Sequence, residues 1–397
     1  MIRKTAKGAL GLVMVLYFLF LTLFGLGDFL YPDTISRLQG ERVEEVFCFS
    51  FATDPDGASV LSQSGGVRSQ NQKVLAFGFL PIKEVRVNFY PKTELVCGGE
   101  LFGVRLETEG LLVTSLGTVK TDEGEISPGE KAGIRAGDLI RSADGVELKC
   151  ASDLVKIIAK SDGHEVKLCL DRDGITQTLS LVPAKSADGS GYKAGLWIRD
   201  GAAGIGTVTF FDPISGAFAG LGHAVCDSET GVAFPLAKGT VCQAKIEGIA
   251  KGEKGAAGEI RGRLEKDSIG TLQKNTLTGV YGSYDTLPSA DTLPIGLKGE
   301  VQTGKAHIVC TLDETGKKEY EIEIEEIISK DRDHKNLMIH ITDPALLEKT
   351  GGIVQGMSGS PIIQNGKLVG AVTHVLVGDP TRGYGIFIEN MLKNMPE

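Results

Sequence analysis

The chain opens with a basic tip followed by a long uncharged apolar run. Residues 1–8 hold three basic side chains, and residues 9–27 hold no charged one. This run is close to the roughly 20 residues that a helix needs to cross a bilayer. We therefore expect residues 1–30 to form a transmembrane signal-anchor helix whose positive flank stays in the cytoplasm. A cleaved signal peptide is the alternative, and in either case residues 31–397 are exported.

Beyond the anchor, hydrophobic positions fall into short alternating segments separated by glycine-rich turns. Residues 31–95 read as a β-rich connecting region, in which Val85–Tyr90 alternates like a strand. Residues 193–397 supply the clearest strand candidates: Ile205–Phe211, Thr240–Ile249, Gly258–Leu264, Thr278–Tyr281, Lys305–Leu312, Glu319–Ile328 and Leu337–Ile341. The only helix expected there is Ile388–Asn394. Many short strands between turns predict a sandwich or a pair of barrels.

Composition and charge narrow the class of protein. The chain has 397 residues, 53 of them glycine, and a net charge of −9 without a basic cluster in its body. Nucleic-acid binding is therefore not expected as the main task. Seven cysteines are present without C-x-x-C spacing, so a zinc site is not indicated. Cys226 reads as a small buried hydrophobic residue rather than as a nucleophile.

Residues 96–184 form a second unit with a glycine loop, an A-G-x-x-x-G-D-x-I stretch, a helix over Ala151–Ala159 and two further strands. This unit resembles a PDZ domain. The resemblance implies that the loop and strand at Leu101, Phe102, Gly103 and Val104 bind a peptide carboxylate and accept an added strand. The alternative is that the unit only packs against its neighbour. Residues 185–192 are polar and read as a short linker to the last domain.

The stretch Gly352–Pro361 holds a serine between glycines, followed by a β-hairpin with a turn at Asn365-Gly366. A trypsin-like serine protease presents its nucleophile in this way. The glycines permit positive φ, so that the amides of Gly356 and Ser358 could point into one space and stabilise an oxyanion. Ser360 is expected only to bond within the loop. A plain Gly/Ser-rich turn is the alternative for these residues alone.

A serine nucleophile requires a base, and that base requires a carboxylate that orients it. Of six histidines, His223 lies in a glycine-rich turn that can hold its ring in the open, whereas His340 and His374 lie in alternating apolar segments. Asp343 ends the segment before Pro344, with Asp227 and Asp379 as rivals. An Asp before Pro is also typical of a turn or helix cap, so the residues alone leave the carboxylate open.

The serine loop, the Gly-His-Ala turn and the Thr-Asp-Pro segment, behind an anchor and a PDZ-like unit, resemble the SpoIVB peptidase family of endospore-forming bacteria. The resemblance implies a trypsin-like double β-barrel and a triad of His223, Asp343 and Ser358, with no metal or organic cofactor. In trypsin-like enzymes the Asp lies much nearer to the His in sequence, so Asp343 departs from that pattern.

The same resemblance implies cleavage of the chain itself and of a membrane-bound regulator of the pro-sigma-K processing complex. This would occur in a sporulating cell, in the space between the forespore membranes. The PDZ groove would hold a partner's tail or the chain's own N-terminal segment. Two other functions stay open: a catalytically silent PDZ adaptor, and a general extracytoplasmic quality-control protease.

Overall fold

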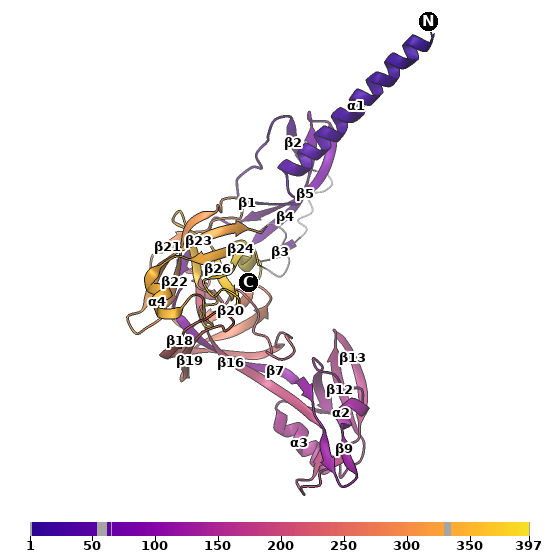
Figure 1. The fold of residues 1–397 in the computed structure, drawn as a ribbon, viewed down its shortest axis with the longest axis vertical. Helices are drawn as coiled ribbons and strands as arrows, with labels where there is room; N and C mark the ends of the chain where they lie inside the picture. Colours follow the sequence, from indigo (N-terminus) through magenta and orange to yellow (C-terminus); the bar gives the residue numbers. More distant parts are fainter. Residues whose placement is uncertain (1, 54–61, 65, 329–334, 397) are drawn as a thin grey trace.

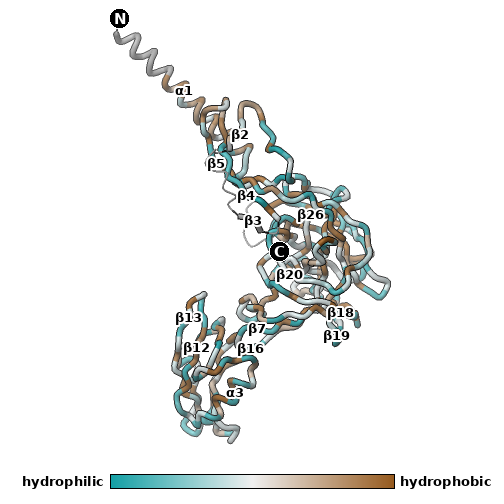
Figure 2. The backbone as a smooth tube through the Cα atoms, turned by 180° about the vertical axis from the view of Figure 1, so that it is seen from behind, coloured by the Kyte–Doolittle hydropathy of each residue, from teal (hydrophilic) through white to brown (hydrophobic). Residues whose placement is uncertain are grey.

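The computed structural model describes residues 2–53, 62–64, 66–328 and 335–396. A long helix projects at one end, two packed barrels form the middle, and the PDZ-like unit lies at the other end (Figure 1). The described part of the long helix is largely hydrophobic, while hydrophobic and hydrophilic residues intermix along the barrel strands (Figure 2). The mainly β class predicted from the sequence is confirmed.

The helix is part of a small N-terminal module. Helix α1 (Ile2–Leu30) contains the apolar window Val13–Leu30, which is long and apolar enough to cross a membrane. It leads into a sheet of order β1-β5-β4-β2, with β3 beside β4. The strands are β1 (Thr34–Leu38), β2 (Phe49–Thr53), β3 (Ser62–Ser64), β4 (Val67–Ala76) and β5 (Leu80–Tyr90). The last turns of α1 are embedded, because Leu23 is buried in the core of this sheet and Leu26 and Leu30 pack against it.

A ring of six strands forms the first barrel. Strand β7 pairs with both β16 and β18, and the order continues through β19, β20 and β17 back to β16. The strands of this sheet are β6 (Glu94–Cys97), β7 (Leu101–Leu116), β16 (Leu196–Phe211), β17 (Ala217–Gly220), β18 (Leu236–Ala250), β19 (Glu259–Thr276), β20 (Gly279–Tyr284) and β21 (Thr292–Pro294). Alternate side chains such as Phe102, Val104 and Leu106 fill its interior.

The second barrel is closed in the order β22-β23-β24-β27-β26-β25. Its elements are β22 (Gly304–Thr311), β23 (Lys317–Ile327), β24 (Leu337–Ile341), α4 (Pro344–Thr350), β25 (Pro361–Gln364), β26 (Lys367–Val375), β27 (Arg382–Phe387) and α5 (Ile388–Leu392). Helix α4 was not expected from the sequence. It is only two turns long, and begins at an Asp-Pro pair and ends at Gly351 with φ of 73°. A C-terminal barrel was expected and is confirmed.

The PDZ-like unit is inserted between the outer halves of β7 and β16. Its elements are β8 (Val119–Thr121), β9 (Gly124–Ile126), α2 (Pro128–Lys131), β10 (Leu139–Ala143), β11 (Val146–Glu147), α3 (Ala151–Lys160), β12 (Val166–Arg172), β13 (Ile175–Leu181), β14 (Ala184–Lys185) and β15 (Tyr192–Lys193). Its core includes Leu111, Val113, Leu154 and Ile158. The predicted helix over Ala151–Ala159 agrees with α3.

This insertion corrects two expectations. Residues 185–192 are no linker, because Ala184–Lys185 and Tyr192–Lys193 pair as a hairpin within the PDZ-like unit. The expected groove at Leu101, Phe102, Gly103 and Val104 lies in the first barrel instead, with β16 on one edge and β18 on the other. Both edges of this segment are occupied, so no peptide strand can join it. The first part of the expected 96–184 unit therefore belongs to the barrel.

Candidate active site

The two barrels bring the serine loop and the histidine turn together. His223 follows β17 of the first barrel, and Ser358 precedes β25 of the second. They approach closely at Gly359, where an added Cβ would lie 2.0 Å from the Thr207 carbonyl oxygen and 2.5 Å from the Leu221 amide nitrogen. Only a glycine permits this contact, and its φ of 96° is also one that glycine favours. The two expected residues therefore lie at one seam.

The backbone of the serine loop leaves two donors unused. The amides of Gln355, Met357 and Gly359 donate to Gly258, Val354 and Val372 carbonyls. Within the described residues, the amides of Gly356 and Ser358 have no acceptor. Gly356 has φ of 100°, which turns the chain between these donors. Two free amides beside a serine hydroxyl have the character of an oxyanion-stabilising pair.

Two buried threonines of β16 hold the serine loop. Thr207 Oγ1 donates to the Gly356 carbonyl at 2.7 Å, and Thr209 Oγ1 donates to the Gly359 carbonyl at 2.8 Å. The Thr207 amide also donates to the Ser358 carbonyl at 2.9 Å. The loop of the second barrel is thus fixed by a strand of the first. The only sign of this role in the sequence was the spacing of the two threonines, which puts both on the same face of a strand.

Ser358 and Ser360 have different surroundings. Ser358 is half-buried, and its hydroxyl donates to the Thr373 carbonyl at 2.8 Å. Ser360 is completely buried, and its hydroxyl donates to the Met357 carbonyl at 2.7 Å. The prediction that Ser360 bonds within the loop is confirmed. Only Ser358 is partly open to solvent.

The His223 ring is held by its own turn. Its Nδ1 lies 2.8 Å from the Ala224 carbonyl oxygen. With the proton on Nδ1, this bond leaves Nε2 free to accept a proton. Burial lowers the pKa of His223, so the ring is neutral at pH 7. The preceding Leu221 has φ of 66°, a left-handed conformation that is strained for leucine.

Asn275 anchors the segment that follows His223. Its side-chain oxygen accepts from the Val225 amide at 2.8 Å, and its nitrogen donates to the Val225 and Phe234 carbonyls at 2.9 Å. No local pattern indicated this role, since Asn275 lies far along the chain in β19. The histidine turn is therefore braced from within the first barrel.

A second histidine lies beside the first. The rings of His223 and His374 have centroids 5.0 Å apart. Burial, followed by the positive charge that His223 carries when it is protonated and by that of Lys335, lowers the pKa of His374 to about 4. His374 follows Thr373, whose main-chain carbonyl accepts a hydrogen bond from the Ser358 hydroxyl. The seam therefore contains two neutral imidazoles rather than one.

None of the three candidate carboxylates bonds to His223 within the described residues. Asp343 caps α4, and its oxygens accept from the amides of Ala345, Leu346 and Glu321 at 2.9, 3.0 and 3.3 Å. Asp227 pairs with Arg199 at 3.1 Å. Asp379 pairs with Arg382 at 3.0 Å. In this conformation, the group that orients His223 is the Ala224 carbonyl.

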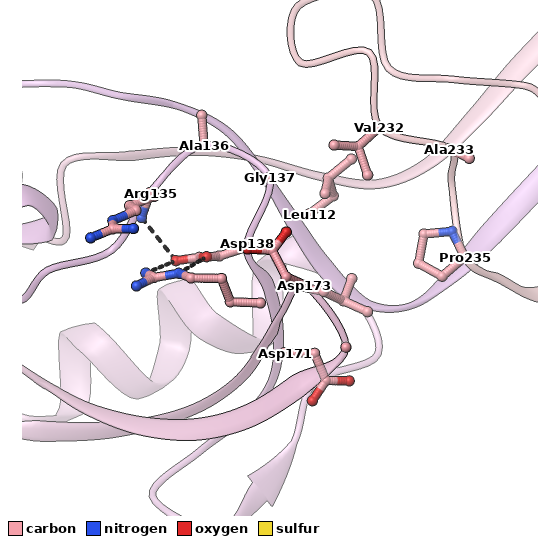
Figure 3. A pocket seen from close by; sticks show the side chains of 13 residues that line it. Leu112, Arg135, Ala136, Gly137, Asp138, Asp171, Asp173, Val232, Ala233 and Pro235 are labelled. Carbon is pink, nitrogen blue, oxygen red and sulfur yellow. Dashed lines mark hydrogen bonds and ion pairs between the residues drawn. The ribbon is translucent and has the colours of Figure 1, made fainter. Parts of the chain in front are cut away.

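A cavity of about 430 Å³ lies where the PDZ-like unit faces the first barrel. Asp138 accepts from the Arg172 guanidinium at 2.7 Å and from the Arg135 amide at 2.8 Å. Figure 3 shows Asp138 on one side of the cavity and Val232, Ala233 and Pro235 on the other. These three residues belong to the segment that links His223 to β18. The cavity is separate from Ser358, but one of its walls continues into the histidine turn.

Comparison with known proteins gives matches for the peptidase region and for the PDZ-like unit. The profile of SpoIVB peptidase S55 matches residues 190–392, and that of a PDZ domain matches residues 121–172. A protein of Lactococcus lactis named as a zinc metalloprotease is 36% identical over 100 residues, which is 25% of this chain and 21% of that protein. The chain thus spans about a fifth of that relative's length.

Two solved structures are similar over parts of the chain. The PDZ domain of an SdrC-like protein from Listeria monocytogenes is 23% identical, with 23% of this chain and 90% of that chain covered and a TM-score of 0.19. The active form of the Rv3671c protease from M. tuberculosis is 15% identical, with 47% and 70% covered and a TM-score of 0.27. The S55 match spans half of the chain and contains both His223 and Ser358. On this evidence the chain belongs to the SpoIVB peptidase S55 family and carries a PDZ domain.

Proposed function

We propose that this protein is a serine endopeptidase in which Ser358 is the nucleophile and His223 the general base. The observation that carries the proposal is the convergence at one seam of Ser358, a neutral histidine and two unused amides. The amides of Gly356 and Ser358 would bind the oxyanion of the tetrahedral intermediate.

The chemistry follows from these positions. Nε2 of His223 accepts the Ser358 proton as the hydroxyl oxygen attacks a peptide carbonyl carbon. The imidazolium then donates that proton to the departing amine, and an acyl-enzyme remains. In the deacylation step, water attacks the acyl-enzyme in the same way, and His223 again acts as the base. In the described conformation the Ala224 carbonyl accepts a hydrogen bond from Nδ1 of His223.

The described conformation has the features of a resting state. The Ser358 hydroxyl donates to Thr373 rather than to His223. The Asp343 carboxylate accepts hydrogen bonds from three backbone amides. We propose Asp343 as the triad carboxylate on the family resemblance. In the active state, the serine loop and the start of α4 would then rearrange. Substrate binding along the seam would supply the free energy for that change.

The decisive test compares Ser358→Ala with Ser360→Ala in the purified full chain. Ser358→Ala should abolish both proteolysis and labelling by a fluorophosphonate probe while the fold is retained. Ser360→Ala should still label, with a free energy of unfolding lowered by about 1 kcal/mol for one lost buried hydrogen bond. An inactive Ser360→Ala beside an active Ser358→Ala would show that the nucleophile is wrongly assigned.

For the PDZ domain we propose a peptide groove between β16 and α3. The outer segment Leu196–Arg199 pairs with β7 on one edge, and within the described residues no strand pairs with its other edge. Helix α3 lies beside it, since Asp200 accepts from the Ala151 amide at 3.0 Å. A free strand edge next to a helix can accept an extended peptide. The occupant would be a partner's tail or the chain's own N-terminal segment.

We further propose that α1 is an uncleaved anchor. Leu23, Leu26 and Leu30 belong to the core of the N-terminal module, so cleavage at the end of the helix would remove them. On the family resemblance, we propose that the exported chain acts in the space between the forespore membranes. Its substrates would be its own N-terminal region and a membrane-bound regulator in the pathway to pro-sigma-K. Rapid digestion of casein would instead favour a general quality-control protease, and absence of probe labelling would favour an adaptor.

A further inference from the structure

Three large aromatic side chains are exposed at one end of the N-terminal module. Phe47 lies in the loop before β2, and Phe77 and Phe79 lie in the turn that joins β4 to β5. Their side chains are 86%, 56% and 75% exposed. We call Phe47, Phe77 and Phe79 the aromatic rim. Exposed apolar side chains that gather at one place mark a site of interaction.

Hydrogen bonds place the members of the rim together. The Phe77 amide donates to the Cys48 carbonyl at 2.7 Å, which joins the turn to the loop. The Phe79 amide donates to the Ala76 carbonyl at 3.3 Å, which closes the turn. The same tip also pairs Ala76 with Phe49 across β4 and β2. The rim is therefore one structural feature rather than three scattered residues.

Two of its residues have unfavourable backbone conformations. Phe47 has φ of 61° and Phe77 has φ of 53°. The left-handed region favours glycine and tolerates asparagine and aspartate, and it is uncommon for bulky residues. Elsewhere in the described chain, Asp or Asn occupies four of the five other non-glycine positions with positive φ. Phenylalanine at these two positions has no benefit for the local fold, because neither ring is buried.

The rim lies beside the apolar helix. An added Cβ at Gly27 would lie 2.8 Å from Ile82 of β5, and Lys83 Nζ binds Asp28 at 2.7 Å, so this part of β5 is level with the end of α1. The strand begins two residues earlier, at Leu80, about 7 Å further toward the start of the helix at 3.3 Å per residue. That distance equals about 4–5 helical residues at 1.5 Å each. The turn thus reaches the level of Leu23 or beyond. Figure 1 shows the strands of the N-terminal module beside the end of α1 that leads into them.

At that level the environment of α1 changes. Val13 to Leu21 are each at least 42% exposed, whereas from Leu23 on buried and exposed residues alternate: Leu23 is 7% exposed and Phe24 45%. Between Val13 and Leu21 the helix is therefore uncovered on all sides, and from Leu23 onward one side of it packs on the sheet. A bilayer around the uncovered stretch would have its surface at the height of the rim.

We propose that the aromatic rim inserts into the interfacial region of the membrane that α1 crosses. Lipid is the proposed partner of the rim because the rim adjoins the uncovered apolar surface of α1. The bilayer that surrounds the helix would therefore also cover the three rings. Aromatic side chains at the headgroup level combine an apolar ring with a position next to water. The proposal rests on α1 acting as an anchor and is independent of the catalytic assignment.

The insertion would fix the orientation of the whole enzyme. Ser36 of β1 donates to Glu389 of α5 at 2.8 Å, and the Lys298 amide donates to the same buried carboxylate at 3.1 Å. The module is thus joined to the second barrel and does not hang from it by a loose tether. With the rim in the membrane, the helix and the turn provide two points of contact. The seam is then held at a set distance from the bilayer.

Fluorescence quenching tests the proposal directly. The full chain has one tryptophan, Trp197, so Trp197→Phe gives a tryptophan-free background. Phe79→Trp in that background places a probe in the rim, and Ile214→Trp places a control at a position 92% exposed on the peptidase domain. Both are reconstituted into phosphatidylcholine vesicles with and without bromine at shallow acyl carbons. Phe79→Trp should lose emission with the brominated lipid, and Ile214→Trp should not.

A second substitution separates membrane contact from folding. Phe77→Asn suits the left-handed backbone, so the Tm in detergent should be unchanged or higher, while quenching of the Phe79→Trp probe should decrease. Equal emission of that probe in brominated and plain vesicles would overturn the proposal. Emission that changes with protein concentration at a fixed lipid concentration would also overturn the proposal, because a second copy of the chain would then cover the rim. Failure of the chain to enter vesicles at all would refute the anchor instead.

Discussion

At the scale of single residues, the two side chains proposed for the chemistry already have partners, and each partner limits what its group can do. The Ser358 hydroxyl is held by Thr373, and the His223 ring by Ala224. Only the amides of Gly356 and Ser358 are free within the described residues. In the proposed mechanism the Ser358 hydroxyl must turn from Thr373 toward His223, and Asp343 must leave the amides at the start of α4.

Asp343 offers a clean test, because its two roles respond differently to substitution. Asparagine and serine cap helices about as well as aspartate, so Asp343→Asn and Asp343→Ser should leave the free energy of unfolding nearly unchanged. If Asp343 is the triad carboxylate, both should lose up to about 10⁴ in kcat. Unfolding in urea and turnover of a peptide substrate measure the two quantities. Normal turnover in both variants would mean that Asp343 is a cap alone.

The pH dependence follows from the lowered pKa of His223. Free histidine has a pKa of about 6.5, so the unfolded chain takes up a proton below that pH while the folded chain resists it. Stability should therefore be full above pH 6.5 and decline as the pH falls toward the folded pKa. The acid limb of kcat/KM should likewise lie below pH 6.5, because the base must be neutral. A limb above pH 7 would contradict burial of this ring.

At the scale of elements, β16 links the two halves of the site. Its inner end carries Thr207 and Thr209, which hold the serine loop, and its outer end forms the edge strand of the PDZ domain. A single strand of the first barrel therefore contacts the serine loop and also forms one side of the proposed peptide groove.

Thr207 provides the test at this scale. Thr207→Val keeps the side-chain volume but leaves the Gly356 carbonyl without its donor, at a cost of about 1–3 kcal/mol in the free energy of unfolding. We expect kcat to fall with little change in KM, since the oxyanion amides lose their alignment. Thr207→Ser restores the hydroxyl and should recover most of the turnover. Equal losses in the two variants would assign the effect to the methyl group and to packing.

At the scale of the whole molecule, the PDZ domain is an insertion in a hairpin of the peptidase domain. Residues Leu101–Glu107 of β7 pair with Gly201–Thr207 of β16 before the two strands continue outward. The connection is therefore a two-stranded arm, and motion of the PDZ domain is restricted to bending of that arm. The pair formed by Arg199 and the buried Asp227 adds a direct contact between the arm and the histidine turn.

Excision of the insertion tests this organisation. Replacing residues 108–200 by a short Asn-Gly turn should let Glu107 and Gly201 close as a hairpin, because the inner ladder is retained. The shortened chain should still label at Ser358 but should cleave a membrane-tethered substrate poorly. Loss of labelling together with loss of the folded barrels would show that the PDZ domain is needed to build the site. Normal cleavage would leave the domain without a regulatory role.

Some of these features were determined by local sequence. The apolar run, the alternating strands and the Gly-Met-Ser-Gly-Ser-Pro loop are patterns within short windows, and each predicted segment from Ile205–Phe211 to Leu337–Ile341 overlaps an observed strand. Glycines at Gly356 and Gly359 mark backbone conformations that other residues rarely adopt. The candidates Ser358 and His223 could be named for the same reason. Their local surroundings are unusual without any knowledge of the fold.

The pairing of distant segments was decided only by the tertiary structure. The motif at Leu101–Val104 fits a PDZ strand locally, but its neighbours in space are β16 and β18, and register with distant strands cannot be read from a single segment. The support of the loops by Thr207 and Asn275 has the same origin, as does the use of Asp343 as a helix cap. Local backbone preference is set by neighbours in the chain, whereas hydrogen-bond partners of buried groups depend on which surfaces the whole fold brings into contact.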